Sequence, residues 1–398
     1  MNVALINQFF PPAQAPTGRL LADLAAELVR RGHAATVLAS AAGYGAEAAA
    51  APAALAGAQV MRVGRSDVHR HGAGAKLADY LAFFRGARRE LARLPRLDAV
   101  VCLTTPPFIG LLGAHERKAR GTPFVLWCMD LYPEALAAHG WLRPWNPLKP
   151  LLAAAAREER RRAFAAVALG PDMAELLRAS GARVEEIPVW SGLAADDATR
   201  AAARDLRRAR GWAADEIVLL YSGNMGRAHR ADEFAALAEA MKAQALRCRF
   251  VFAGAGPLRA EWERRWGDRF EFLPPAPPET AAAHLLAADV HLVSQRPEWT
   301  GVVVPSKFQA ACALGRPVVF AGPPQSAVGR WLAAADAGWR LPPGDAAALA
   351  ATVDEIGDAR RRAEKGAGAA RIGEQRFAQK ANCAKMAELV ERAAKERA

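Results

Sequence analysis

The sequence has few cysteines and no paired cysteine motif. Its five cysteines are odd in number and far apart, and none forms a Cys-x-x-Cys pair; they are Cys102, Cys128, Cys248, Cys312 and Cys383. This spacing excludes a disulfide framework and the usual zinc patterns. We therefore expect a protein of a reducing compartment that needs no metal and no cofactor.

Long apolar runs are missing as well. A membrane-spanning helix needs about 20 consecutive apolar residues, whereas the longest candidates, such as residues 151–156, end at charged residues. The first residues, Met1 to Asn7, lack the basic segment of a secretory leader. We expect a cytoplasmic protein whose contact with a membrane is peripheral.

Glycine and proline are too few for a fibrous or low-complexity chain: 32 Gly and 26 Pro occur among 398 residues. Hydrophobic residues make up 52% of the chain, and 53 Lys and Arg against 41 Asp and Glu give a net charge of +12. This composition excludes a disordered chain and a small stapled module, and the length corresponds to two or three domains. The positive charge alone also permits a nucleic-acid-binding protein, but no such motif is present.

Short apolar runs alternate with amphipathic segments, which is typical of an α/β fold with parallel sheets. In the first half we predict strands at residues 3–6, 35–38, 99–103, 124–128, 166–169 and 184–187. In the second half we predict strands at residues 217–221, 250–252, 270–273, 290–293 and 317–320. The spacing of Leu20, Leu21, Leu24 and Leu28 predicts a helix that ends before Gly32.

A charged stretch at residues 196–210 separates the two series of strands. We therefore expect two doubly wound, Rossmann-like domains, at residues 1–192 and at residues 193–375. The last segment, residues 376–398, is expected to form a helix that returns to the first domain. Ligands of doubly wound sheets bind beyond the carboxyl ends of the strands, so functional residues are expected there.

Three loops lie at such strand ends. The loop at residues 7–19 contains Gly18 and leads into a helix, where backbone amides can hold an anion. The loop at residues 221–230 combines two glycines with Arg227 and Arg230 and suits a diphosphate, whereas His229 by itself indicates nothing. A third glycine-bearing turn spans residues 252–257. Each of these loops can also be a plain connection.

Other candidate residues follow the remaining strands. Lys307 stands after a strand and before a helix, so it is either a phosphate contact or a solvated lysine at a helix start. Asp130 follows the strand at residues 124–128 and is either a carboxylate that orients a hydroxyl group or a helix cap. Glu134 is a second candidate carboxylate, while His139 is expected to be a turn residue.

Four stretches together resemble bacterial glycosyltransferases of the GT4 family, which have the GT-B fold, and more closely the WbuB-like branch. They are NQFFPP with TGRL at the start, DLYPE at 130–134, YSGNMGRAH at 221–229 and GVVVPSKFQAACALGRPVV at 301–319. They occur in the family's order along essentially the whole chain. The resemblance implies transfer of a sugar from a nucleotide sugar, expected to be a UDP-sugar, with retention of the anomeric configuration. It also implies that the domain at residues 1–192 binds the acceptor and that the domain at residues 193–375 binds the nucleotide sugar.

By position, the resemblance implies that Gly223, Asn224 and Arg227 line the donor diphosphate and that Gly18 approaches it from the other domain. Ser306 and Lys307 would then face the nucleotide sugar. Asp130, Arg227 and Lys307 are the expected catalytic residues. The expected acceptor is a saccharide or a polyprenyl-linked saccharide in envelope polysaccharide or O-antigen synthesis.

The chain departs from the family at positions that matter for donor binding. The frequent pair of glutamates separated by seven residues is replaced by Val302 and Ala310, and the frequent Arg and Lys of the second domain are replaced by Asn224 and His229. The basic side chains near the loop must then balance the diphosphate. A nucleotide-sugar 2-epimerase of the same fold and a catalytically silent scaffold are the alternatives.

A segment at residues 141–152 mixes tryptophans with cations and is a candidate contact with the inner leaflet. Trp141 and Trp145 suit the headgroup region, and Arg143 and Lys149 suit anionic lipid. The alternative is that these cations only solvate an Ala-rich helix. Donor base, sugar, linkage and oligomeric state cannot be obtained from these patterns.

Overall fold

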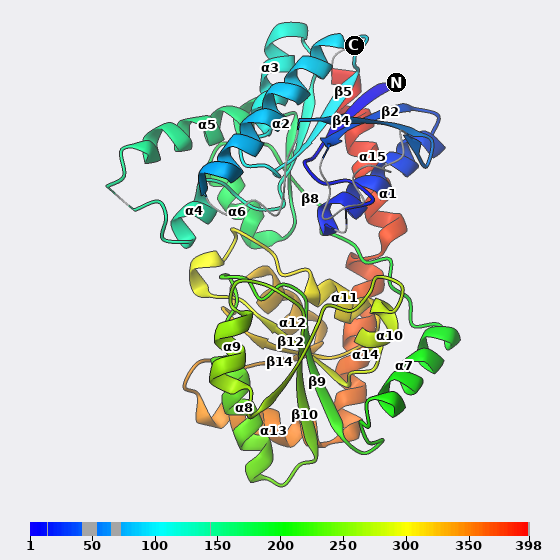
Figure 1. Cartoon of the computed structure of the whole chain (residues 1–398), viewed down its shortest axis with the longest axis vertical. Coiled ribbons are helices and arrows are strands. Elements are labelled where there is room, and N and C mark those ends of the chain that lie inside the picture. Colours follow the sequence, from blue (N-terminus) through cyan, green and yellow to red (C-terminus); the bar gives the residue numbers. More distant parts are fainter. Residues whose placement is uncertain (14, 42–53, 65–72, 144, 397–398) are drawn as a thin grey trace. The chain divides into compact units, whose positions relative to one another are not determined.

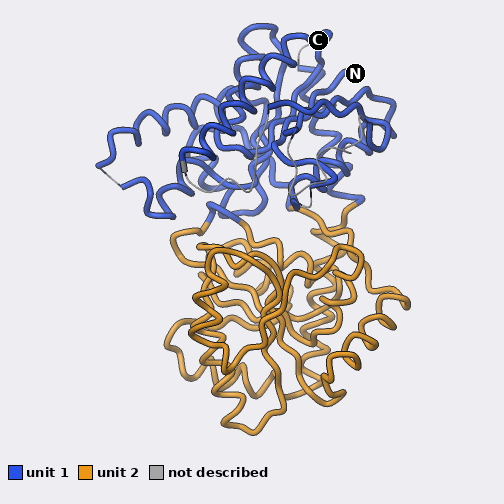
Figure 2. The backbone as a smooth tube through the Cα atoms, viewed as in Figure 1, with its two compact units in different colours: residues 1–188, 301–303, 380–398 blue, residues 189–300, 304–379 orange. Residues whose placement is uncertain are grey.

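The chain folds into two compact units, which Figure 2 shows in different colours. The computed structural model describes residues 1–398 except 14, 42–53, 65–72, 144 and 397–398. Unit 1 comprises Met1–Pro188, Gly301–Val303 and Lys380–Ala398, and unit 2 comprises Val189–Thr300 and Val304–Gln379. The sequence placed the boundary at 192/193, and contacts change from unit 1 to unit 2 after Pro188.

Unit 1 is built on an eight-stranded sheet in the order β3-β4-β2-β1-β5-β6-β7-β8, parallel except for the β3–β4 pair. Its strands are β1 (Asn2–Ile6), β2 (Ala34–Ser40), β3 (Ala54–Leu55), β4 (Ala58–Val63), β5 (Ala99–Leu103), β6 (Phe124–Trp127), β7 (Ala165–Ala168) and β8 (Val184–Glu186). Its helices are α1 (Pro16–Arg30), α2 (Ala73–Arg93), α3 (Gly110–Arg120), α4 (Glu134–Ala138), α5 (Leu148–Arg162), α6 (Pro171–Ala179) and α15 (Gln379–Glu396) (Figure 1).

Unit 2 is built on a six-stranded parallel sheet in the order β11-β10-β9-β12-β13-β14. Its strands are β9 (Ile217–Ser222), β10 (Cys248–Ala253), β11 (Phe270–Leu273), β12 (Val290–Ser294), β13 (Val318–Ala321) and β14 (Gly338–Arg340). Its helices are α7 (Asp197–Ala209), α8 (Asp232–Ala243), α9 (Arg259–Trp266), α10 (Ala281–Leu286), the 3-10 helix η2 (Pro297–Trp299), α11 (Lys307–Ala313), α12 (Ala327–Ala335), α13 (Ala346–Gly357) and α14 (Ala359–Arg376). The predicted α/β class with two parallel-sheet domains is therefore confirmed.

The central strands are fully buried, which explains why their sequences read as continuous apolar runs. All five residues of β5 and all four of β6 and β7 are buried, because helices cover both faces of a parallel sheet. In unit 2 the same burial produces an aromatic core around Phe252, whose ring stacks on Phe270 at 4.4 Å between centroids and on Tyr221 at 5.4 Å.

Three strands were not predicted from the sequence, namely β3, β4 and β14. β4 alternates apolar residues with Gln59 and Arg62, and the Arg62 guanidinium donates to the carbonyl groups of Phe10, Pro11 and Ser40. β14 has only three residues, although Trp339 is buried. Strands this short, or with charged residues in them, carry too weak an apolar pattern to stand out.

Helix α1 starts earlier than predicted, at Pro16 instead of Leu20. Pro16 occupies the first turn, where its missing N–H costs nothing. The predicted leucines are buried, and Gly32 follows the helix with φ of +83°.

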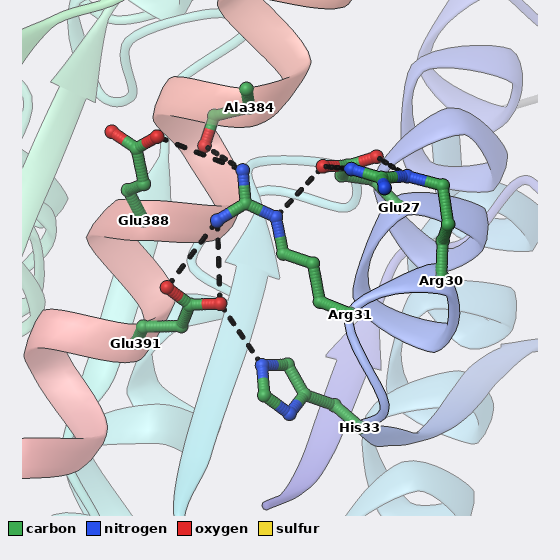
Figure 3. Close-up of polar contacts among 7 residues, drawn as sticks. All are labelled: Glu27, Arg30, Arg31, His33, Ala384, Glu388 and Glu391. Carbon is green, nitrogen blue, oxygen red and sulfur yellow. Dashed lines mark hydrogen bonds and ion pairs between the residues drawn. The ribbon is translucent and has the colours of Figure 1, made fainter.

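Helix α15 packs on unit 1 through a network of charged groups (Figure 3). Arg31 donates to the Glu391 carboxylate at 3.3 Å and lies 3.6 Å from Glu388, while His33 Nε2 lies 3.0 Å from Glu391. Arg31 Nε also donates to the Glu27 carboxylate at 2.7 Å. Hydrogen bonding by Arg30 and Arg31 lowers the pKa of Glu27 to about 2. This network ties the last helix to the first.

Among the helices of the described residues, none combines the length and the apolar character that crossing a bilayer requires.

Candidate functional site

In unit 2, two glycine-bearing loops meet where β9 and β10 end. The Gly223 amide donates to Ala253 O at 2.8 Å, and the Met225 amide donates to Ala255 O at 2.7 Å. Gly254 has φ of +147°, and a Cβ there would lie 2.0 Å from Gly223 O. The two loops can touch only because this position carries no side chain.

The loop after β9 is also fixed to the end of β12. The Arg296 amide donates to Ala228 O at 2.8 Å, and the Arg230 amide donates to Ser294 Oγ at 3.2 Å. β9 lies between β10 and β12, so the order of strands along the chain reverses at this point of the sheet. Such a switch point is where doubly wound sheets bind ligands.

Lys307, the first residue of α11, extends its side chain into this loop. Its Nζ lies 3.3 Å from Asn224 O, 3.2 Å from His229 Nε2 and 4.9 Å from the centroid of the Tyr221 ring. A Cβ on Gly223 would lie 3.2 Å from Lys307 Cε, so the glycine makes room for the lysine. Burial lowers the pKa of Lys307 to about 8, and the ammonium group remains mostly charged at neutral pH.

His229 has a role that the sequence alone did not indicate. Its side chain is buried, and Nδ1 lies 2.6 Å from Ser294 O while Nε2 faces Lys307. Burial and the Lys307 charge lower the pKa of His229 to about 3, so the ring is neutral. No local sequence pattern indicates this role, because Ser294 and Lys307 lie 65 and 78 residues away from His229 along the chain.

The other predicted donor residues lie around this cluster with different surroundings. Asn224 and Arg227 are exposed, and Ser306 is exposed at the start of α11. Arg230, in contrast, is held by Glu233 in an ion pair at 2.8 Å and is only 17% exposed. Of the cations expected to balance a diphosphate, Lys307 and Arg227 are therefore the better placed, since Arg230 already has a carboxylate partner.

In unit 1, Asp130 follows β6 and is held by backbone contacts. Its amide donates to Thr104 Oγ1 at 3.2 Å, and it forms an isolated antiparallel bridge with Val303, a residue of the same unit. The side chain is half-buried, and burial raises the pKa of Asp130 to about 6. A carboxylate with this pKa is ionised at neutral pH and can accept a hydrogen bond from a hydroxyl group.

Glu134 and His139 are engaged by neighbouring side chains. Both Glu134 carboxylate oxygens accept from the buried Arg160 guanidinium at 2.8 Å. The His139 ring stacks on Trp141 with centroids 4.3 Å apart, just before the turn at Gly140. Of the two carboxylates predicted to face an acceptor, Glu134 is therefore already paired with Arg160.

Gly18 lies in the first turn of α1. A Cβ at this position would lie 3.2 Å from Phe9 O and from Phe10 Cα. The glycine thus lets the helix approach the loop that follows β1, where Asn7 Nδ2 donates to Phe9 O at 2.6 Å.

Comparisons with known proteins match both units. Residues 17–190 match the family model for a glycosyl transferase 4-like domain, and residues 216–358 match the model for glycosyl transferases group 1. The chain is a GT4-type glycosyltransferase with the GT-B fold.

Individual relatives are distant from this glycosyltransferase. It is 24% identical to the probable glycosyltransferase WbjE of Pseudomonas aeruginosa over 287 residues, which cover 70% of this chain and 71% of the relative. Its fold matches sucrose-phosphate synthase from Thermosynechococcus elongatus with a TM-score of 0.73 and 18% identity over 98% of both chains. It also matches Anabaena HepE in complex with UDP-glucose, with a TM-score of 0.67 and 17% identity over 98% of this chain and 99% of that one.

The positions where this glycosyltransferase departs from its family lie in different units. Val302 belongs to the short segment assigned to unit 1, where its carbonyl accepts from the Leu131 amide at 3.0 Å, and Ala310 belongs to α11 in unit 2. Gly301, next to Val302, donates to Asp172 Oδ2 at 3.0 Å. The described structure thus places no acidic side chain at either position.

The segment from Trp141 to Leu151 carries four of the seven large apolar side chains that are exposed among the described residues. Trp141 is 63% exposed and Trp145 is 76% exposed, and Leu148 and Leu151 are 56% and 65% exposed. The Arg143 guanidinium lies 5.8 Å from the centroid of the Trp145 ring. Pro144, within this segment, lies outside the described residues. We call residues 141–151 the tryptophan segment.

Proposed function

We propose that the protein transfers a sugar from a nucleotide-sugar donor, expected to be a UDP-sugar, and that unit 2 binds the donor's diphosphate. The Lys307 ammonium carries this proposal: it is held beside the glycine loops by neutral acceptors, so its full charge is available to an anion. Exposed Arg227 adds a second cation on the same loop. The solved relative HepE, which binds UDP-glucose, supports the choice of donor class.

The reaction breaks the bond between the anomeric carbon and the diphosphate oxygen and forms a bond from that carbon to an acceptor hydroxyl oxygen. The hydroxyl proton leaves to an oxygen of the departing diphosphate, and Asp130 orients the acceptor by accepting a hydrogen bond from another of its hydroxyl groups. Negative charge accumulates on the diphosphate as the bond breaks, and Lys307 and Arg227 stabilise it. We propose retention of configuration and no requirement for a metal ion, since side-chain cations can perform the neutralisation that a metal performs elsewhere.

A transfer assay tests this function. Purified protein is incubated in EDTA with UDP-, GDP- and ADP-sugars and with polyprenyl-diphosphate saccharides, and release of the nucleotide is measured. We expect transfer from one donor series, with a product whose anomeric proton coupling matches that of the donor. Lys307→Met should lower the rate by about 100-fold, whereas Lys365→Met, which removes a lysine paired with Asp336, should not. Conversion of the donor into its 2-epimer without net release of nucleotide would favour the epimerase alternative, and an unchanged donor would favour a silent scaffold.

We further propose a polyprenyl-linked acceptor for envelope polysaccharide synthesis and docking of the tryptophan segment on an anionic inner leaflet. Exposed tryptophans next to Arg143 and Lys149 suit the headgroup region of such a membrane. A solved relative, WaaG, is described as a glycosyltransferase involved in lipopolysaccharide biosynthesis, which supports the acceptor class; it matches with a TM-score of 0.68 and 16% identity over 98% of this chain and 99% of that one.

Vesicle flotation tests the docking. The protein should bind phosphatidylglycerol vesicles more tightly than phosphatidylcholine vesicles. Each cation near an anionic surface contributes about 1 kcal/mol, so the double variant Arg143→Gln, Lys149→Gln should bind about 30-fold more weakly. The matched control, Arg264→Gln with Lys242→Gln, removes the same charge from exposed positions of unit 2. An equal loss of vesicle affinity in both double variants would show that binding depends only on net charge and would contradict docking through the tryptophan segment.

A further inference from the structure

The side chain that holds Lys307 in place is a histidine. A carbonyl oxygen only accepts hydrogen bonds, so the 2.6 Å contact with Ser294 O requires that His229 Nδ1 carries the hydrogen. Because the ring is neutral, Nε2 then has a free electron pair. That atom lies 3.2 Å from Lys307 Nζ and accepts one of its hydrogens. The contact with Ser294 thus selects the tautomer that can bind the lysine.

The ammonium group has three hydrogens, and the structure accounts for two of them. One is donated to His229 Nε2 and the other to Asn224 O, which also accepts from the Tyr221 hydroxyl group at 2.9 Å. The face of the Tyr221 ring supports the ammonium from a third direction. The remaining hydrogen is left for a ligand at the glycine loop.

Both acceptors of Lys307 are neutral groups. Within the part of the chain that the structure describes, no carboxylate forms an ion pair with Lys307, whereas Arg230 on the same loop is neutralised by Glu233. A carboxylate at position 229 could hold the lysine equally well, but it would cancel the charge. An imidazole fixes the position of the ammonium and leaves its charge intact.

We propose that His229 is a positioning residue for donor binding: its Nδ1-protonated, neutral imidazole fixes the Lys307 ammonium beside Gly223 and Asn224 without neutralising it. This inference deepens the proposed function and rests on it, since it takes Lys307 as a contact of the donor diphosphate. His229 itself need not touch the donor.

Three variants of His229 separate the position of the lysine from its charge. His229→Gln keeps a neutral acceptor, His229→Glu offers an acceptor of the same length with a negative charge, and His229→Leu offers none. Affinity is measured by calorimetry in EDTA at pH 7 with whichever of UDP, GDP and ADP binds the wild type most tightly. We expect the Gln variant to bind within about threefold of the wild type, the Leu variant about tenfold more weakly, and the Glu variant at least 30-fold more weakly.

His291→Gln is the matched control. His291 is also buried, and its Nε2 also contacts a backbone carbonyl, Leu285 O at 3.0 Å, but it lies near the start of β12 and pairs with Leu220. Its replacement should leave the affinity unchanged. Thermal unfolding of every variant shows whether it is folded.

A spectroscopic measurement on the folded wild type adds a second test that needs no variant of His229. With ¹⁵N-labelled histidine, the resonance of His229 Nε2 should report an unprotonated nitrogen that accepts a hydrogen bond, and Lys307→Met should shift it while Nδ1 stays protonated. A protonated Nε2 would overturn the inference.

The outcomes of the calorimetry distinguish the two proposals. If the wild type binds none of the three nucleotides, the proposed function fails and the inference fails with it. If the wild type binds and the Gln and Glu variants have equal affinities, only the inference is overturned. If the Leu variant binds the nucleotide as tightly as the wild type, only the inference is overturned as well, because the lysine then does not need an acceptor at position 229.

Discussion

The depressed pKa of Lys307 predicts how donor binding depends on pH. With a pKa of about 8, the ammonium group is about nine-tenths protonated at pH 7 and about one-tenth protonated at pH 9. Only the charged form attracts a diphosphate. Affinity for the nucleoside diphosphate should therefore fall about tenfold between pH 7 and pH 9, with the protonated fraction of Lys307 reaching one half at about pH 8.

The other groups that face Lys307 do not titrate in this interval. The pKa of His229 lies near 3, so the imidazole is already neutral, and burial raises the pKa of the Tyr221 phenol well above its usual value. The pH dependence can therefore be assigned to Lys307. Removing its charge with Lys307→Met should lower affinity at pH 7 by about 10- to 100-fold, which is the usual effect of a hydrogen bond from a charged donor.

Calorimetric titrations at pH 7, 8 and 9 with the wild type and Lys307→Met test this reasoning. Any ionisation of the nucleotide base occurs in both titrations, so the difference between the two series isolates the lysine. The wild type should lose affinity for the nucleotide as the pH rises. Lys307→Met should bind the nucleotide weakly at all three pH values, with no change in affinity between them. A parallel loss in both proteins, or an apparent pKa near 10.5 in the wild type, would refute a desolvated Lys307 in the donor site.

Three further predictions concern other parts of the structure. Asp130→Asn should lower kcat/KM for the acceptor and abolish the acid limb near pH 6 in the profile of kcat/KM against pH. The wild-type carboxyl, whose pKa is raised to about 6, loses its charge as the pH falls through that value. An unchanged acid limb in the variant would show that Asp130 takes no part in the reaction. Gly254→Ala should displace the loop after β9 and weaken donor binding at least tenfold, because the added Cβ would meet Gly223 O. Gly344 has φ of +71°, but no atom lies within 4 Å of an added Cβ, so Gly344→Ala should only lower the free energy of unfolding by about 1 kcal/mol, as urea unfolding would show. Arg31→Met should destabilise unit 1 by about 1–2 kcal/mol more at pH 7 than at pH 2, as urea unfolding at the two pH values would show. The pKa of Glu27 is lowered to about 2, so its ion pairs stabilise the fold above pH 4.5 and are lost as the pH falls towards 2. Arg30→Met, at a more exposed position, should have a smaller effect in the same urea unfolding experiment.

The buried strands could be predicted from the sequence because parallel strands covered on both faces are continuous apolar runs. β5 and β6 are of this kind, and both were predicted within one residue of their observed ends. β4 and β14 could not be predicted, because Arg62 interrupts one and the other has only three residues. Their formation depends on pairing with β2 and β13, which are distant in sequence or separated by a helix.

The candidate site was predictable only in part, for a similar reason. Glycines and cations at strand ends predicted the loops that contain Gly223 and Lys307. The contact between Lys307 and His229 joins residues 78 positions apart, and no local pattern encodes it. The pairing of Arg230 with Glu233 is local, yet the sequence alone left open whether Arg230 or Lys307 carries the available charge.

The central claim is that unit 2 binds the diphosphate of a nucleotide through Lys307. The most direct test is thermal unfolding of the purified protein in EDTA with saturating UDP, GDP or ADP, for the wild type, Lys307→Met and the control Lys242→Met, which changes an exposed lysine of α8. A ligand at 100 times its Kd stabilises the folded state by about 2.7 kcal/mol. We predict a saturable rise in Tm for one nucleotide in the wild type and the control, and none in Lys307→Met at the same concentration. The same rise in all three proteins would contradict the central claim.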